Sequence, residues 1–293
     1  MAIIRLRSLG DCVLTTPALA LLKGFRPDLH IRVVVEDRFR AVFEGNPDID
    51  EILPPDLALL RGVRPDLCLN LHGGTRSAWM TALSGARYRA AFGHFRQQFV
   101  YNARIPRAQE ILGVERKVHT AEHLASAVFY LGVPITDIPR AKLWDMALPC
   151  PGQGRALPHV IHPGAATAAK TWPAQRFLAV AEELQQSGHE VVFIGAATDD
   201  VSPFRAFRTV QGAPLQQIKS LLASAALFIG NDSGPAHMAA AFGVPSIVLF
   251  GPSDPAIWGP WRAPAEVIAS PEDIARIGVD RVLDAVMRLR VNA

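Results

Sequence analysis

The amino-acid sequence predicts an α/β protein of two doubly wound domains, each a parallel sheet flanked by helices. The chain has 293 residues, 49% of them hydrophobic. That is more than one compact core normally uses, and it fits two domains of about 150 residues. Short apolar strand-like segments alternate with helical patterns, an order typical of parallel sheets with right-handed crossovers. The second half repeats this plan, so we expect two domains facing each other across a central cleft.

In the first half, strands are predicted at residues 3–6, 31–35 and 67–71, with a break at 8–11 and a helix over 15–22. In the second half, strands are predicted at 160–161, 191–194, 227–229 and 246–250, and helices at 173–186 and 274–289. Residues 148–155 are rich in proline and glycine and have no periodicity. We interpret them as a linker between domains over residues 1–150 and 151–293.

The composition argues against several classes of protein. The net charge is only +3. No apolar run reaches the roughly 18 residues of a membrane-spanning helix, and the chain begins with a strand instead of a signal peptide. The chain has three cysteines, which lie far apart in the sequence: Cys12, Cys68 and Cys150. Their odd number and wide spacing argue against a disulfide framework or a zinc cluster. We expect a soluble cytosolic protein.

The segment 230–237 has the residues of an anion site. Ligands of doubly wound sheets bind beyond the carboxyl ends of the strands, and this segment follows a predicted strand and precedes a helix. Asp232 or Ser233 can cap that helix, Pro235 suits its first turn, and Gly234 allows close backbone approach. The free amide groups then suit a pyrophosphate. An ordinary capped helix is the alternative, although it does not explain the glycine or the following histidine.

A second loop, 162–173, follows the first strand of the same half. Its small residues and Lys170 resemble a phosphate cradle, in which open backbone donors act together with one mobile positive charge. The spacing of a Walker A motif is absent. A surface loop with a solvated lysine is the alternative. Two such loops on one sheet edge favour the functional interpretation.

A third loop places Asp11 after the first strand, where Gly10 permits a sharp turn. The carboxylate can cap the following helix or act as a general base toward a ligand. No G-x-G-x-x-G motif follows the first strand and no G-x-S-x-G motif occurs, which argues against a nicotinamide dehydrogenase and an α/β-hydrolase. His119 and His123 lack a third ligand, so we expect a packed or solvated pair and no metal site.

The stretch between Asp66 and Glu110 contains no acidic residue, while arginines and aromatic residues alternate along it. Such a stretch suits an anionic substrate or anionic lipid. A solvated arginine face is the alternative, and no nucleic-acid-binding module is visible. The candidate acceptor-binding residues are Arg76, Arg87, Arg89 and Arg96.

Taken in order, these loops resemble glycosyltransferase family 9, the ADP-heptose:lipopolysaccharide heptosyltransferases. The resemblance covers nearly the whole chain and rests on residues 3–19, 46–52, 162–173, 231–240 and 248–255. It implies a GT-B fold of two Rossmann-like domains. It implies a nucleoside-diphosphate sugar donor, ADP-heptose, on the C-terminal domain. A lipopolysaccharide-core or related glycan acceptor would bind the N-terminal domain, and the last helix would pack back on that domain.

The same resemblance implies an inverting, metal-independent transferase without a cofactor. Asp11 would take the proton of the acceptor hydroxyl, and Lys170 and the amide groups at 233–235 would stabilise the leaving diphosphate. The implied donor contacts are Gly10, Gly164, Thr167, Asp232, Ser233, Gly234, Pro235 and His237. The protein would work in the cytoplasm, in peripheral contact with the inner membrane and without nucleic acid. A nucleotide-sugar 2-epimerase and a non-catalytic nucleotide- or glycan-binding protein are the alternatives.

Overall fold

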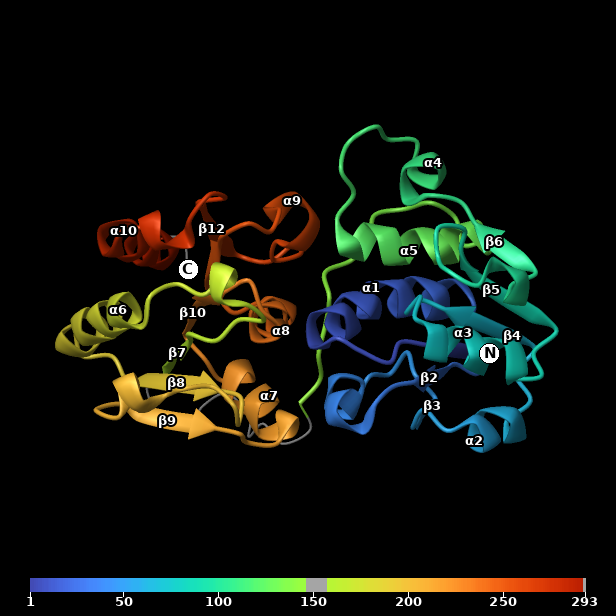
Figure 1. Cartoon of the computed structure of the whole chain (residues 1–293), viewed down its shortest axis with the longest axis horizontal. Helices are drawn as coiled ribbons and strands as arrows, with labels where there is room; N and C mark the ends of the chain where they lie inside the picture. Colours follow the sequence, from blue (N-terminus) through green and yellow to red (C-terminus); the bar gives the residue numbers. More distant parts are fainter. Residues whose placement is uncertain (146–156, 292–293) are drawn as a thin grey trace. The chain divides into compact units, whose positions relative to one another are not determined.

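The structure, a computed structural model, describes residues 1–145 and 157–291 (Figure 1). Within it the chain forms two compact units, the first covering Met1–Trp144 and the second beginning at Asp145. This division falls a few residues before the predicted boundary at residue 150. The predicted linker, 148–155, lies outside the described residues. Each unit is a six-stranded parallel sheet with flanking helices, so the predicted α/β class with two doubly wound domains is confirmed.

The sheet of the first unit has the strand order β3-β2-β1-β4-β5-β6. Its strands are β1 (Ala2–Ile4), β2 (Arg32–Val34), β3 (Glu51–Leu53), β4 (Leu67–Asn70), β5 (Tyr88–Phe92) and β6 (Ala103–Ile105). The sequence predicted β1, β2 and β4 within the segments 3–6, 31–35 and 67–71, which contain three or four Ile, Leu or Val residues each. It missed β3, β5 and β6, which contain only two, none and one of these residues.

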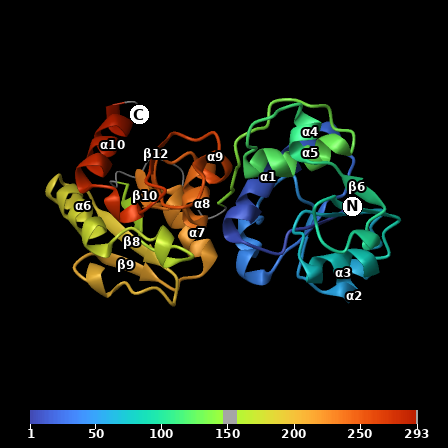
Figure 2. The ribbon, with the colours of Figure 1, turned by 45° about the horizontal axis from the view of Figure 1, so that its top comes forward.

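The helices of the first unit are α1 (Leu9–Phe25), α2 (Leu57–Gly62), α3 (Thr75–Leu83), α4 (Ala108–Leu112) and α5 (Thr120–Tyr130), with the 3-10 turns η1 (Asp37–Val42) and η2 (Gln98–Val100). Helices α1 and α5 pack side by side, as Figures 1 and 2 show. Helix α1 begins six residues earlier than predicted (at Leu9 instead of Thr15) because Ser8 and Asp11 form a capping box at its amino end. Gly10 is therefore buried in the first turn of the helix, and the predicted sharp turn at this residue is wrong.

The sheet of the second unit has the order β12-β11-β10-β7-β8-β9. Its strands are β7 (His159–His162), β8 (Val191–Gly195), β9 (Arg208–Gln211), β10 (Leu227–Asn231), β11 (Ser246–Phe250) and β12 (Ala265–Ala269). Its helices are α6 (Ala174–Gln186), α7 (Leu215–Ala223), α8 (Gly234–Phe242), α9 (Pro255–Trp258) and α10 (Val279–Val291), with the turns η3 (Ala168–Lys170), η4 (Ser202–Phe204) and η5 (Ile274–Arg276). No helix in the described ranges is long and apolar enough to cross a membrane.

The last helix, α10, packs against α6, β11 and β12 of its own unit. Its buried residues Val282, Ala285 and Val286 belong to the same core cluster as Trp172 and Phe177. The second unit therefore buries one face of this amphipathic helix. The packing of the last helix on the first domain stays a prediction.

Both sheets reverse their strand order at one place, between β1 and β4 in the first unit and between β7 and β10 in the second. In doubly wound sheets, ligands bind in the crevice beyond the carboxyl ends of the two strands at this switch point. The loops after β1, β4, β7 and β10 are therefore where a site should be sought. They include the three loops singled out from the sequence.

Candidate functional site

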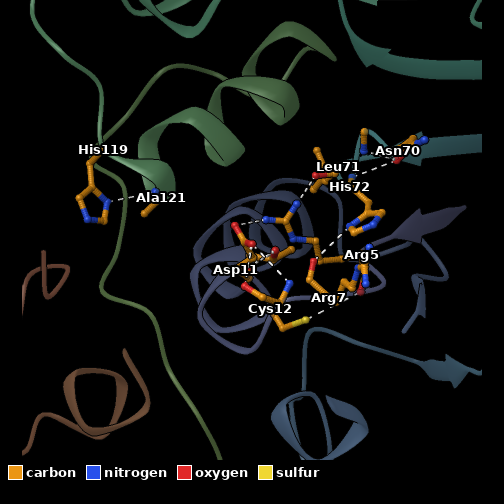
Figure 3. Close-up of polar contacts among 12 residues, drawn as sticks. Arg5, Arg7, Asp11, Cys12, Asn70, Leu71, His72, His119 and Ala121 are labelled. Atoms are coloured by element: carbon orange, nitrogen blue, oxygen red, sulfur yellow. Dashed lines mark hydrogen bonds and ion pairs between the residues drawn. The ribbon is translucent and has the colours of Figure 1, made fainter. Parts of the chain in front are cut away.

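At the switch point of the first unit, one arginine joins the two strand ends to Asp11. Arg5 directly follows β1 and is buried. One of its terminal nitrogens forms an ion pair with Asp11 Oδ1, and the other donates to the carbonyl oxygen of Leu71, just after β4 (Figure 3). The position of the Asp11 carboxylate is thus fixed by both central strands of the sheet.

The second carboxylate oxygen of Asp11 is held by Ser8. Oδ2 accepts hydrogen bonds from the Ser8 hydroxyl at 2.9 Å and from its backbone N–H at 3.3 Å. Asp11 therefore caps α1, one of the two roles that the sequence left open. Its side chain is still 23% exposed, so the carboxylate is fixed in orientation and remains accessible from solvent. Its role as general base stays a prediction.

Three histidines lie at or near the same sheet edge, two of them just after strand ends. His72 follows β4, and its Nδ1 lies 3.1 Å from the Arg7 carbonyl oxygen (Figure 3). His94 follows β5, and its ring centroid lies 5.4 Å from that of His123, which stacks on Phe92 at 3.9 Å. Burial, with help from His94 and Arg5, lowers the pKa of His123 to about 4. The His123 ring is therefore neutral at neutral pH.

His72 and His94 were not among the residues predicted from the sequence. The position of His72 just after the predicted strand 67–71 was an available signal, whereas His94 follows β5, a strand that was not predicted. His119 and His123, which were expected to be a packed or solvated pair, have separate structural roles. The His119 side chain accepts from the Ala121 N–H at 3.1 Å at the start of α5 (Figure 3), and His123 stacks on Phe92.

In the second unit, a fully buried asparagine fixes the loop that carries Lys170. Asn231, the last residue of β10, accepts from the Trp172 N–H at 3.1 Å and donates to the Pro163 carbonyl oxygen at 2.7 Å. The Trp172 indole in turn donates to the Ile277 carbonyl oxygen at 2.9 Å. Both ends of the loop are thereby tied to the switch point, so the loop is more ordered than a free surface loop.

Lys170 and the amino end of α8 converge through one carboxylate. Lys170 Nζ lies 2.9 Å from Asp232 Oδ2, and the same oxygen accepts from the Ser253 hydroxyl at 2.6 Å. The Asp232 side chain is only 8% exposed and that of Lys170 29%. Ser253, in the turn after β11, is a site residue that the sequence analysis did not select, although it lies within the family-like segment 248–255.

The amino end of α8 differs from the predicted capping pattern. Asp232 binds Lys170, and the Ser233 hydroxyl lies in hydrogen-bond contact with His162 Nδ1 at 3.0 Å. These side chains thus contact the end of β7 and the loop after it instead of capping the helix. Pro235 lies in the first turn and has no N–H, so the amide donors there belong to Ser233, Gly234 and Ala236. Pro235 cannot be one of the predicted amide donors.

The remaining predicted donor contacts lie around the same switch point. His237 is buried in the first turns of α8. Thr167 is exposed, and its carbonyl oxygen accepts from the Lys170 N–H at 3.0 Å. A Cβ at Gly164 would lie 2.6 Å from Asp199 Oδ2 and 3.1 Å from His162 Nε2. Only glycine therefore fits at residue 164 without displacing the Asp199 side chain.

His162 is buried at the end of β7, between Ser233 and Asp199. Burial lowers its pKa to about 4, against a smaller opposing effect of Asp199. The imidazole is therefore neutral at neutral pH. It positions the Ser233 hydroxyl beside the helix amino end without adding a charge there.

The four candidate acceptor arginines do not come together. Arg76 in the first turn of α3 and Arg96 after β5 are exposed beyond the carboxyl ends of their strands. Arg87 precedes β5, so it lies at the opposite edge of the parallel sheet from Asp11. The Arg89 guanidinium donates to the carbonyl oxygens of Val100 at 2.8 Å and Ala86 at 3.1 Å. The prediction is therefore wrong in grouping Arg87 and Arg89 with the other two, because neighbours in sequence flank opposite ends of a strand.

A lysine beside a helix amino end at the switch point of a doubly wound unit is typical of proteins that bind phosphate-bearing ligands. Comparison with known proteins defines the class further. The sequence model of glycosyltransferase family 9 (heptosyltransferase) matches residues 58–277. The chain is also 29% identical over 289 residues to lipopolysaccharide heptosyltransferase 3 of Escherichia coli K12, covering 86% of this chain and 82% of that protein. The chain belongs to glycosyltransferase family 9 and is a glycosyltransferase.

Solved structures show the same fold. A family 9 glycosyltransferase from Veillonella parvula superimposes with a TM-score of 0.87 at 23% identity, over 100% of this chain and 97% of that one. An E. coli heptosyltransferase with ADP-2-deoxy-2-fluoro heptose gives a TM-score of 0.79 at 18% identity, over 100% and 99% of the two chains. The expected GT-B class, with two Rossmann-like units, is confirmed. The central cleft between the units stays a prediction.

Proposed function

We propose that this protein transfers heptose from ADP-heptose to a lipopolysaccharide-core or related glycan acceptor, with inversion and without a metal or cofactor. The observation that carries the proposal is the convergence of Lys170 and the amino end of α8 at the switch point of the second unit. Its relatives are heptosyltransferases by name, and one solved relative holds an ADP-heptose analogue. The 2-epimerase and the non-catalytic binding protein have less support.

The donor diphosphate would bind at the amino end of α8. The N–H groups of Ser233, Gly234 and Ala236 and the helix dipole favour an anion there. In the structure, Lys170 is neutralised by Asp232, so the lysine would turn toward the diphosphate when the donor binds. During transfer the leaving diphosphate gains negative charge, and an oriented donor of this kind is typically worth about 3 kcal/mol of barrier.

The acceptor hydroxyl would be activated at Asp11. Inversion requires the hydroxyl to attack the anomeric carbon from the face opposite the diphosphate, while its proton passes to a base. Asp11 suits this role because Arg5 and Ser8 fix its orientation and because its carboxylate is partly exposed. His72 and the exposed Arg76 and Arg96 lie beyond the same sheet edge, where they would bind the acceptor.

The proposed acceptor is part of a glycolipid. We therefore also propose that the protein works in the cytoplasm in peripheral contact with the inner membrane. Acceptor binding would bring the first unit to the lipid surface, while the donor would be taken up from solution.

The experiment that tests this function combines ligand screening with a product assay. ADP at 100 times its dissociation constant should stabilise the protein by about 2.7 kcal/mol, whereas UDP and GDP should stabilise it less. With ADP-heptose, ADP should be released only when a lipopolysaccharide-core acceptor is present. Conversion of a nucleotide sugar without acceptor would instead establish the epimerase, and binding without turnover would establish a binding protein.

A further inference from the structure

Helix α3 and the turn η2 carry a group of exposed apolar side chains. Trp79 and Leu83 on α3 are each 48% exposed, and Phe99 in η2 is 71% exposed. Trp79 and Leu83 are four residues apart and share one face of the helix. The Trp79 and Phe99 rings meet edge to face with their centroids 6.1 Å apart. These three residues form one continuous patch, called here the Trp79 surface.

The Trp79 surface is held in place by the first unit itself. The opposite face of α3 is buried through Ala78 and Thr81, so Trp79 and Leu83 cannot turn inward. The Gln97 side-chain amide donates to Thr75 Oγ1 at 3.3 Å, which joins the beginning of η2 to that of α3. The exposure of these side chains is thus built into the fold.

Arginines border this surface. Arg76 lies one turn before Trp79 on the same helix face, and its guanidinium donates to the Pro55 carbonyl oxygen at 3.1 Å. Arg104 donates to the Gln98 carbonyl oxygen, next to Phe99, at 3.5 Å. Arg96 is exposed just before η2. The nearby Asp56 carboxylate, beside Pro55, is used in capping α2, where it accepts from the Leu59 N–H at 3.0 Å. Residues 67–109 contain no acidic side chain. The border is therefore predominantly cationic.

We propose that the Trp79 surface docks on an anionic lipid bilayer. Tryptophan and phenylalanine favour the headgroup region of a membrane, and arginines beside them bind lipid phosphates and respond to the negative surface potential. A contiguous apolar patch with a cationic border fits a lipid surface. The patch lies on α3, whose first turn lies at the sheet edge where the acceptor would bind. This inference deepens the proposed function and rests on it, because docking there would present a membrane-embedded acceptor to the edge that carries Asp11.

The test uses the full chain and vesicles of phosphatidylethanolamine with phosphatidylglycerol, compared with pure phosphatidylcholine. We expect binding to the anionic vesicles and little to the neutral ones, with a loss at high salt. Trp79→Ala combined with Phe99→Ala should reduce the partition coefficient about tenfold or more. Arg104→Glu should reduce it severalfold. The matched control is Phe25→Ala with Tyr130→Ala, whose side chains are 48% and 44% exposed elsewhere on the unit; it should bind as wild type does.

Equal vesicle binding by the Trp79 and Phe99 variant and by wild type would overturn the proposal, as would an equal loss in the control. A change in oligomeric state in place of a change in vesicle binding would assign the surface to a second copy of the chain. Transfer to a water-soluble, delipidated acceptor should be unchanged in the Trp79 and Phe99 variant. A wild type that binds vesicles but transfers no heptose would overturn the proposed function and leave the docking surface standing.

Discussion

Removal of the Lys170 amine should expose the negative charge of Asp232 to the bound diphosphate. In the structure the two groups are 2.9 Å apart, and the Asp232 side chain is 8% exposed. After Lys170→Ala, the Ser253 hydroxyl remains as a neutral donor to the carboxylate. The site would thus lose one cation and face the diphosphate with an uncompensated anion.

The magnitude is that of a direct contact between the lysine and the diphosphate. Two unit charges about 4 Å apart interact by about 4 kcal/mol at an effective dielectric constant of 20. Lys170 is 29% exposed, so solvent screening reduces this, and we expect ADP binding to weaken by about 2.7 kcal/mol, or roughly 100-fold. Asp232→Asn in the Lys170→Ala background removes the repulsion between the carboxylate and the diphosphate. It should raise the ADP affinity about tenfold above that of Lys170→Ala.

Isothermal titration calorimetry with ADP measures the loss of affinity in Lys170→Ala and its recovery in the double variant. The matched control is Lys23→Ala, because Lys23 also pairs with an aspartate, Asp50, at 2.9 Å, but on the first unit. That variant should bind ADP as wild type does and lose less than about 1 kcal/mol of stability. Unchanged ADP affinity in Lys170→Ala, or no recovery in the double variant, would refute this electrostatic account of the donor site.

Three further predictions concern the catalytic base, a glycine and a histidine. Asp11→Asn should reduce transfer by at least about 100-fold with unchanged ADP affinity by calorimetry; near-normal turnover would remove Asp11 from the mechanism. Gly164→Ala should destabilise the protein by about 1–3 kcal/mol in urea because its Cβ would meet Asp199, whereas Gly24→Ala, with open space around it, should not. The pKa of His123 is lowered to about 4, so the unfolded chain takes up this proton first. The free energy of unfolding should therefore be about 3 kcal/mol lower near pH 4 than above pH 6.5, because protonation of His123 favours the unfolded chain in that interval. His123→Phe should flatten that part of the stability-pH curve, and an unchanged curve would contradict the shift.

The sequence was most informative where structure depends on local pattern. Strands such as β8 and β11 are almost uninterrupted apolar runs, which is the usual pattern of a buried parallel strand. Strand β5, Tyr88–Phe92, includes Arg89, whose guanidinium donates to the carbonyl groups of Ala86 and Val100. Those partners depend on the folded chain, so no local pattern could reveal the strand or the structural role of the arginine.

The sequence could predict which loops form the site, but it could not predict the contacts between their side chains. Parallel strands bring the loops after β7 and β10 to one edge, so Lys170 and Asp232 could be grouped from sequence alone. The hydrogen bond from Ser253 to Asp232 joins residues 21 positions apart, and the bond from Arg5 to Leu71 joins residues 66 apart. Such pairs are set by the register of strands and by packing. For the same reason, the arginines near residues 87–89 were assigned to the wrong edge.

The central claim is best tested by analysing the product of a single reaction. Purified protein, ADP-heptose and a lipopolysaccharide-core acceptor should give one ADP for each new glycosidic bond. Nuclear magnetic resonance of the product should show the anomeric configuration opposite to that of the donor. Consumption of the donor without acceptor, retention of configuration, or absence of a glycosidic product would contradict the account.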